Sequence, residues 1–266
     1  NNDAGWNGSG GPWIQPEQSM QKVVFSETEI EGPAHFDDTL PQPQVVAGFY
    51  RDITVLAFPK TGDYRIDNIQ VKACYQSGYV GPGVIGNDVA PEMKIARSAI
   101  QDLSGAVDGD GHLSWDVPQG RWTVIRFGHT STGVENAPSP ASGRGLECDK
   151  LSREGIEANF NGMMGKIIAD VGDLAGSTLV ATHIDSWENG AQNWTARMRE
   201  EFRARRGYDL TPFLPVMTGR VVDSLEISER FLWDLRQTIS DLVVENYAGY
   251  LREFAQEHGL RLSIEA

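Results

Sequence analysis

Acidic side chains follow two apolar runs of the sequence, at 179–184 and 260–264. Asp185 and Glu188 come after the first run, and Glu265 comes after the second. Two carboxyl groups that face each other can cleave a glycosidic bond, because one protonates the leaving oxygen while the other activates water or attacks the sugar. We therefore predict that Glu188 and Glu265 are catalytic and that Asp185 binds the substrate.

The residue beside Glu188 favours a role as general acid. Trp187 would displace water from the Glu188 carboxyl group and so raise its pKa, as a proton donor at neutral pH requires. We also assign Trp187 to the substrate-binding residues. An acid after a strand can instead be the N-cap or a first-turn residue of the next helix. That alternative stays open for Asp185, and for Glu265 no later sequence distinguishes the two.

A segment rich in glycine and tryptophan, at 5–14, offers a second kind of sugar contact. It contains four glycines and two tryptophans in ten residues. Glycine allows the backbone to approach a ligand closely, and an exposed indole presents a flat apolar face. Trp6 and Trp13 are therefore predicted to stack on the substrate, with Asn7 as a further binding residue. Two tryptophans packed in a core would fit the same pattern.

Three more polar residues are candidate substrate contacts. His183 lies near the end of the first apolar run, on the side opposite Ile184. Glu147 and Asp149 lie in the loop that follows another predicted strand, at 122–127. The alternatives are a hydrogen-bonded core histidine and two structural carboxylates.

Other chemistries find little support in the sequence. There is no Gly-x-Ser-x-Gly elbow, and the five histidines are scattered rather than clustered as a zinc site requires. Cys74 and Cys148 form no Cys-x-x-Cys pair, so one disulfide and two thiols both stay open. Oxygen ligands are abundant, so calcium is the metal that the chain could bind most easily, with its ligands unassigned.

The composition is that of an acidic globular protein. The 266 residues are 40% hydrophobic and carry a formal net charge of −14. Nucleic acid and anionic membranes select for clustered Lys and Arg, so neither is an expected partner, and no apolar run is long enough to span a bilayer. A neutral oligo- or polysaccharide is compatible with this charge. The chain starts at Asn1 rather than Met and shows no signal peptide, and we expect both ends to be truncations.

The spacing of apolar residues predicts strands first and then alternating helices and strands. Short strands are expected at 23–25, 50–58, 112–117 and 122–127, the last two as a hairpin, with a loop at 32–44. Helices are expected at 152–171, 195–206 and 227–258, and strands at 179–184 and 260–264. Ser152 is the expected N-cap of the first helix.

This alternation favours an α/β fold built on a parallel sheet. No Gly-x-Gly-x-x-Gly or Walker loop follows a strand, so a barrel is favoured over a nucleotide-binding doubly wound sheet. We predict an incomplete (β/α)8 TIM-type barrel, with its first part at 1–59, a β-rich insertion at 60–120 and its continuation at 121–266. The active site of such a barrel lies at the carboxyl ends of its strands, where the acids described above are expected.

Several short motifs follow one another in a defined order. They are Gly5–Trp13 (GWNGSGGPW), Tyr50–Ile53 (YRDI), Arg126–Thr130 (RFGHT), Gly145–Lys150 (GLECDK), Asp185–Glu188 (DSWE), Arg206–Asp209 (RGYD) and Glu229–Leu232 (ERFL). Together they resemble glycoside hydrolase family 106, the α-L-rhamnosidases. The resemblance covers nearly the whole chain, apart from a variable stretch at about 60–105.

The resemblance implies a (β/α)8 barrel with β-sandwich additions, an inverting mechanism and a calcium ion that engages rhamnose hydroxyls. It implies that Glu188 is the general acid, that Asp185 contacts or shapes the sugar site and that Glu265 is a strand-end acid. Further acids from later strands would lie beyond Ala266, so the general base stays open. The implied activity is removal of terminal α-L-rhamnosyl residues from plant or microbial glycans, and this substrate class implies a secreted or periplasmic location.

Two other functions fit parts of the sequence. A retaining β-glycosidase of another barrel family would usually show Asn-Glu after its fourth strand, where this chain has Asp185–Glu188. A non-catalytic carbohydrate-binding protein would stack its tryptophans on sugars, but the long amphipathic helices after Ser152 speak against such a β-rich module.

Overall fold

The computed structural model describes residues 9–81 and 86–265. The strands are β1 Gln21–Thr39, β2 Arg51–Pro59, β3 Lys94–Ile95, β4 Gln101–Asp102, β5 His112–Ser131, β6 Ala181–Ile184, β7 Val221–Val222 and β8 Arg261–Ile264. The helices are α1 Ile69–Lys72, α2 Arg153–Val171, α3 Met198–Arg206, α4 Leu225–Leu242 and α5 Leu251–Glu257, with a π-helix at Val243–Tyr250. Short 3-10 helices occupy Pro16–Gln18, Pro91–Met93, Arg97–Ala99, Ser104–Ala106, Ala141–Gly143, Gly172–Leu174 and Thr211–Thr218.

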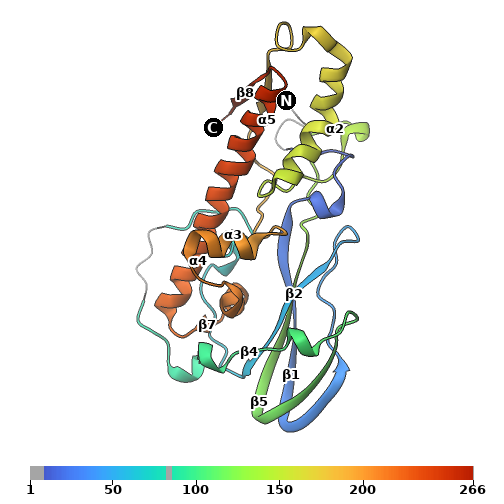
Figure 1. Cartoon of the computed structure of the whole chain (residues 1–266). Coiled ribbons are helices and arrows are strands. Elements are labelled where there is room, and N and C mark those ends of the chain that lie inside the picture. The colour runs from blue at the N-terminus through green and yellow to red at the C-terminus, as the bar shows by residue number, and fades with distance from the viewer. Residues whose placement is uncertain (1–8, 82–85, 266) are drawn as a thin grey trace.

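One end of the molecule is an antiparallel sheet and the other is mainly helical (Figure 1). The sheet has four strands in the order β1-β5-β2-β4, and its long strands β1 and β5 pair from Gln21↔Ser131 to Thr39↔His112. The helical end contains α2, α5 and a two-stranded parallel sheet of β6 and β8. β3 and β7 form a second parallel pair.

The predicted (β/α)8 barrel is wrong, because β1, β2, β4 and β5 pair antiparallel in an open sheet. Only the short pairs β6–β8 and β3–β7 are parallel, and the described part of the chain contains no closed barrel. β-branched and aromatic runs mark where strands occur, but they do not fix the direction in which distant strands pair. The division at 59/60 and 120/121 stays a prediction, and β5 runs across the second boundary.

Two local predictions in the sheet are also wrong. The expected loop at 32–44 is strand as far as Thr39, with Pro33 at a register shift between Gly32 and Ala34 where it has no ladder partner. The expected hairpin at 112–127 is instead the single strand β5, in which Gly120 takes a positive φ of 110° opposite Gly32.

The helices follow the apolar spacing closely. Ser152 caps α2 as expected, since its hydroxyl accepts a hydrogen bond from the Gly155 amide at 3.0 Å. α3 ends at Arg206, and Gly207 after it adopts the left-handed backbone conformation expected of a helix stop. The predicted helix at 227–258 is α4, the π-helix and α5 in succession, and Leu260 then leads into β8.

A buried apolar cluster joins the elements that carry the predicted acids. Its members come from α2, β6, the π-helix and α5, and include Ile156, Phe160, Ile184, Tyr247 and Leu251. This packing fixes the ends of β6 and β8 against α2 and α5.

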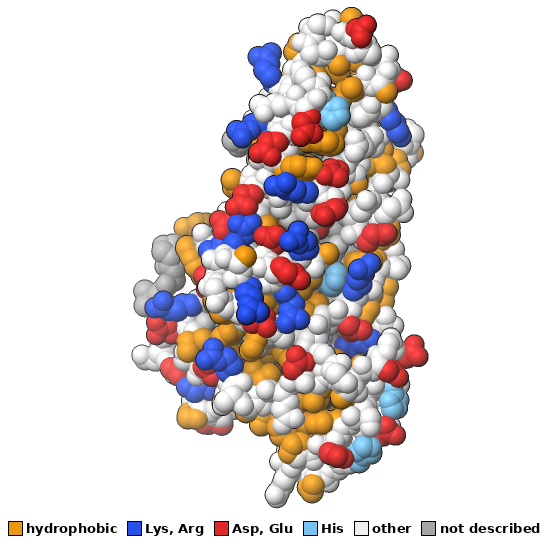
Figure 2. Space-filling view, in the orientation of Figure 1, with side chains coloured by type: hydrophobic (Ala, Val, Ile, Leu, Met, Phe, Trp, Pro, Cys, Tyr) orange, Lys and Arg blue, Asp and Glu red, His pale blue; other side chains and the backbone are white. Residues whose placement is uncertain are grey.

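The outer face of the helical part carries charges of both signs. Figure 2 shows acidic and basic side chains interspersed along it. Arg205 of α3 pairs with Glu245 of the π-helix, and Arg206 of α3 pairs with Asp241 of α4. Both pairs are partly exposed on their acidic side, and water screens the attraction between such charges. Within the described ranges, no helix combines the length and apolar character needed to cross a membrane.

Gly162 in α2 tests the packing of the N-terminal segment on this helix. A methyl group there would lie 2.1 Å from Cγ of Trp13, whereas one at Gly165 would meet the side chain of Asn161, nearest at its amide oxygen at 3.2 Å. We expect Gly162→Ala to lower the free energy of unfolding by about 1–3 kcal/mol in chemical denaturation. The matched change Gly165→Ala should be neutral or stabilising by up to about 1 kcal/mol. Equal stabilisation by both changes would contradict the Trp13 contact.

Candidate functional site

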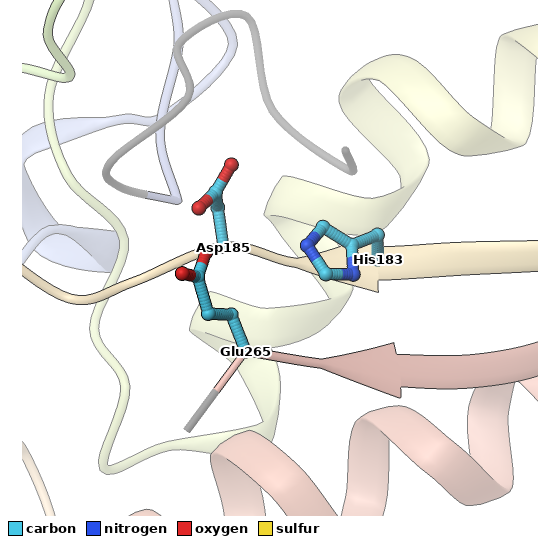
Figure 3. Close-up of side chains that lie close together, drawn as sticks. All are labelled: His183, Asp185 and Glu265. Carbon is cyan, nitrogen blue, oxygen red and sulfur yellow. The ribbon is translucent and has the colours of Figure 1, made fainter.

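The parallel pairing of β6 with β8 brings three predicted site residues together. His183 pairs with Ser263 and Ile184 with Ile264, so Asp185 and Glu265 leave the sheet side by side (Figure 3). The Glu265 amide continues the ladder by donating to the Ile184 carbonyl at 3.0 Å. One ligand atom from each of His183, Asp185 and Glu265 lies within 4.8 Å of the other two.

The two carboxyl groups at this edge interact with each other. A hydrogen bond with Asp185 raises the pKa of Glu265, and the charges of Asp185 and Glu188 raise it further, while His183 acts in the opposite direction. Two carboxylates this close repel each other, so a shared proton or a bound cation between them is favoured. The edge can therefore exchange a proton or hold a positive ion.

The donor set at this edge only partly matches calcium. Asp185 and Glu265 supply the carboxylate oxygens that calcium prefers. The imidazole of His183 is a ligand for transition metals rather than for calcium, and its Nδ1 contacts the Ser263 hydroxyl at 3.2 Å. A calcium ion here would thus use the two carboxylates and take its other ligands from elsewhere.

The segment after β6 places Glu188 at the surface and Trp187 partly inside. Glu188 is exposed, and its Oε1 accepts a hydrogen bond from the Ser186 hydroxyl at 2.9 Å. The structure therefore does not bury Glu188 behind Trp187 as the sequence interpretation expected. The Trp187 ring packs edge-on against Tyr247, and its indole N–H is buried with no acceptor among the described residues.

Glu147, a predicted substrate contact, lies in the interior. It forms an ion pair with Lys150 at 2.6 Å, and neither side chain is exposed to solvent. Its other contacts are the Ser9 amide at 2.9 Å and the Asn189 side-chain amide at 3.0 Å. Sequence reasoning missed Lys150, because an acid and a lysine three residues apart are typical of an exposed helix face as well.

Asp149 lies apart from the β6–β8 acids. It is fully buried and accepts hydrogen bonds from the Thr195 hydroxyl at 2.6 Å and the Leu151 amide at 2.9 Å, as well as from Gln192. Burial outweighs these bonds and raises the pKa of Asp149 to about 6.

A cavity of about 350 Å³ adjoins Asp149, and His129 and Arg51 also line it. Burial, assisted by the charge of Arg51, lowers the pKa of His129 to about 4, so this imidazole is neutral at physiological pH. The cavity lining includes none of the acids at the end of β6 or β8.

Of the N-terminal residues predicted to contact the sugar, Trp13 is the one that falls within the described ranges. Trp6 and Asn7 lie outside the described residues. Trp13 is partly buried against Gly162 of α2, and its indole N–H donates to the Asn159 side chain at 3.3 Å. At least part of its ring surface therefore serves packing. Cys74 and Cys148 do not form a disulfide with each other.

Three comparisons relate the chain to known proteins. The family model described as α-L-rhamnosidase, glycoside hydrolase family 106, matches residues 1–81 and 61–266. A protein of Formosa agariphila named "Putative beta-glucuronidase" is 42% identical over 272 residues, which cover 99% of this chain and 23% of that protein. The structure of a rhamnosidase from Novosphingobium sp. PP1Y has a TM-score of 0.85 at 23% identity, over 99% of this chain and 38% of that chain. The chain thus spans about a quarter of the curated relative.

The raised pKa of Asp149 predicts a pH-dependent stability. The folded state holds this proton up to about pH 6, whereas an unfolded aspartate releases it near pH 4. The free energy of unfolding should therefore fall as the pH rises from 4 to 7, by up to about 3 kcal/mol relative to Asp149→Asn. The asparagine can keep the bonds from Leu151 and Gln192 and donate to Thr195. Denaturant titrations at several pH values measure the difference, and a constant or growing advantage of the wild type would contradict it.

Proposed function

Because the chain belongs to glycoside hydrolase family 106, the α-L-rhamnosidase family, we propose that it supplies the acid–base carboxylates of an enzyme that removes α-L-rhamnosyl residues from glycans. One observation carries this proposal, the hydrogen-bonded pair of Asp185 and Glu265 at the ends of adjacent parallel strands. Glu188 follows three residues after Asp185 and is exposed, so a substrate can reach it.

The proposed roles follow from the exposure of Glu188 and from the interaction of Glu265 with Asp185. Glu188 protonates the glycosidic oxygen as the bond to the sugar breaks. Glu265, whose pKa is raised toward the working range of a base, takes a proton from the water that attacks the opposite face of the sugar. An inverting reaction of this kind needs carboxyl groups roughly 6.5–9.5 Å apart. His183 and Trp187 stay predicted sugar contacts, and the buried indole N–H of Trp187 could donate to a sugar hydroxyl.

Calcium is a second way to neutralise the Asp185–Glu265 pair. A calcium ion would replace the shared proton and would supply a charge that orients sugar hydroxyls. In that case another carboxylate would have to act as the base. A chelator separates the two possibilities, because a proton-linked pair keeps its activity in the chelator and a calcium-linked pair loses it.

A β-glucuronide substrate is the second candidate, favoured by the name of the curated relative. A glucuronate carries a negative charge, and Asp185, Glu188 and Glu265 would repel it. The neutral deoxy sugar rhamnose meets no such repulsion, so we favour it. A retaining β-glycosidase or a non-catalytic binding protein would also be distinguished by activity measurements. Polymeric glycans are met outside the cytoplasm, so we propose a secreted or periplasmic location.

Glu188→Gln tests the role of the general acid. In the full natural polypeptide, we expect aryl α-L-rhamnosides to be cleaved and aryl β-D-glucuronides to resist. The variant should lose roughly 10²–10⁴-fold in kcat/KM on a rhamnoside with a poor leaving group, because general acid catalysis contributes about that much. It should lose far less on a dinitrophenyl rhamnoside, whose leaving group needs no proton.

Glu31→Gln is the matched control, because Glu31 is an exposed glutamate on β1. It should leave both rates unchanged. Equal losses on both leaving groups in Glu188→Gln would remove Glu188 from the acid role. Cleavage of glucuronides alone would overturn the rhamnosidase assignment, and binding without turnover in the folded protein would favour a binding module.

A further inference from the structure

Lys150 is a charged side chain enclosed by aromatic rings. It is fully buried, and its Nζ lies 5.0 Å from the ring centre of Trp187 and 5.7 Å from that of Tyr247. Burial alone would lower the pKa of Lys150, but the charge of Glu147 outweighs it and holds the pKa above its usual range. The side chain therefore remains an ammonium ion, which an aromatic face attracts.

Glu147 links Lys150 to a second residue of the segment that follows β6. Its Oε2 accepts from Lys150 at 2.6 Å, while its Oε1 accepts from the Asn189 side chain at 3.0 Å. Hydrogen bonds to an ionised carboxylate are stronger than those between neutral groups. The ion pair therefore contacts Trp187 through the lysine and Asn189 through the glutamate.

Glu188 lies between these two anchored residues. Trp187 and Asn189 are partly buried, whereas Glu188 is exposed. The Gly190 amide donates to the Glu188 carbonyl at 3.1 Å, and Gly190 takes a positive φ of 79°, so the chain reverses directly after the anchor. The backbone is thus held before and after Glu188, and the exposed Glu188 side chain extends from this held backbone.

We propose that the Glu147–Lys150 pair is a positioning device for Glu188, a role that rests on the proposed function of Glu188 as the general acid. Neither member of the pair touches the substrate in this account. Glu147 is thereby reassigned from a substrate contact to a positioning residue. A buried ion pair is by itself weak evidence for a contribution to stability, since apolar replacements are often tolerated. Its contacts on both sides of one exposed acid are better explained by placement.

Two variants test the proposal without leaving a lone buried charge. Asn189→Ala removes only the link between Glu147 and the segment. The double change Glu147→Gln with Lys150→Met neutralises both members together. Both are made in the full natural polypeptide, and kcat/KM is measured on two aryl glycosides of the sugar it cleaves fastest, one with a poor and one with a good leaving group. Thermal melting is recorded for each protein.

A misplaced acid should slow only the reaction that needs its proton. We expect each variant to lose roughly 10–100-fold on the poor leaving group and less than about 3-fold on the good one. The matched control is Glu27→Gln with Arg220→Met, which removes an ion pair in the sheet region, where buried Arg220 contacts the more exposed Glu27 at 2.6 Å. The control should shift the melting temperature but change both rates equally.

The outcomes separate this inference from the function on which it rests. If Glu188→Gln shows the leaving-group effect but both positioning variants lose both rates equally, the pair is merely structural and the inference is overturned. If Glu188→Gln itself shows no leaving-group effect, the acid assignment fails, and the inference fails with it. A leaving-group effect in Glu188→Gln and in both positioning variants, absent from the control, supports it.

Discussion

The buried ammonium group of Lys150 lies near two aromatic rings and is kept charged by the carboxylate of Glu147. Four segments of the chain meet at this ion pair. Glu147 contacts the backbone of Ser9, and Lys150 contacts Tyr247 of the π-helix. Through Trp187 and Asn189 the pair also reaches the segment after β6. Removing one partner alone would leave an uncompensated buried charge, which is among the costlier defects a protein can carry.

The second constraint is the register between β6 and β8. Because the two strands run parallel and pair in step, the residues that follow them are neighbours although they are far apart in the sequence. This places Asp185 and Glu265 in contact and makes their ionisation interdependent. The strand register thus positions the segment after β6 at Asp185, and the ion pair positions the same segment at Trp187–Asn189.

Part of this arrangement could be predicted from the sequence. The helices and the positions of strands β6 and β8 follow from local apolar spacing and capping, as Ser152 illustrates, and acids placed after parallel strands are expected to meet. The ordered motifs predicted a resemblance to the α-L-rhamnosidases, which the family match confirms. Both inferences rest on features that are local in the chain.

Properties set by distant parts of the chain could not be predicted in this way. The direction of pairing between β1 and β5 depends on contacts far apart in sequence, so the barrel interpretation failed. Burial is also a tertiary property. The sequence left Glu147 open between a substrate contact and a structural carboxylate, and nothing in its neighbourhood distinguishes the buried Lys150 from a surface lysine.

The most direct test of the central claim is a crystal structure of the full natural polypeptide with L-rhamnose bound. We expect a sugar ring beyond the ends of β6 and β8, with its anomeric oxygen in hydrogen-bond reach of Glu188 and with Asp185 or Glu265 on the opposite side. A sugar found instead in the cavity beside Asp149 and His129, with the β6–β8 acids out of reach, would contradict it.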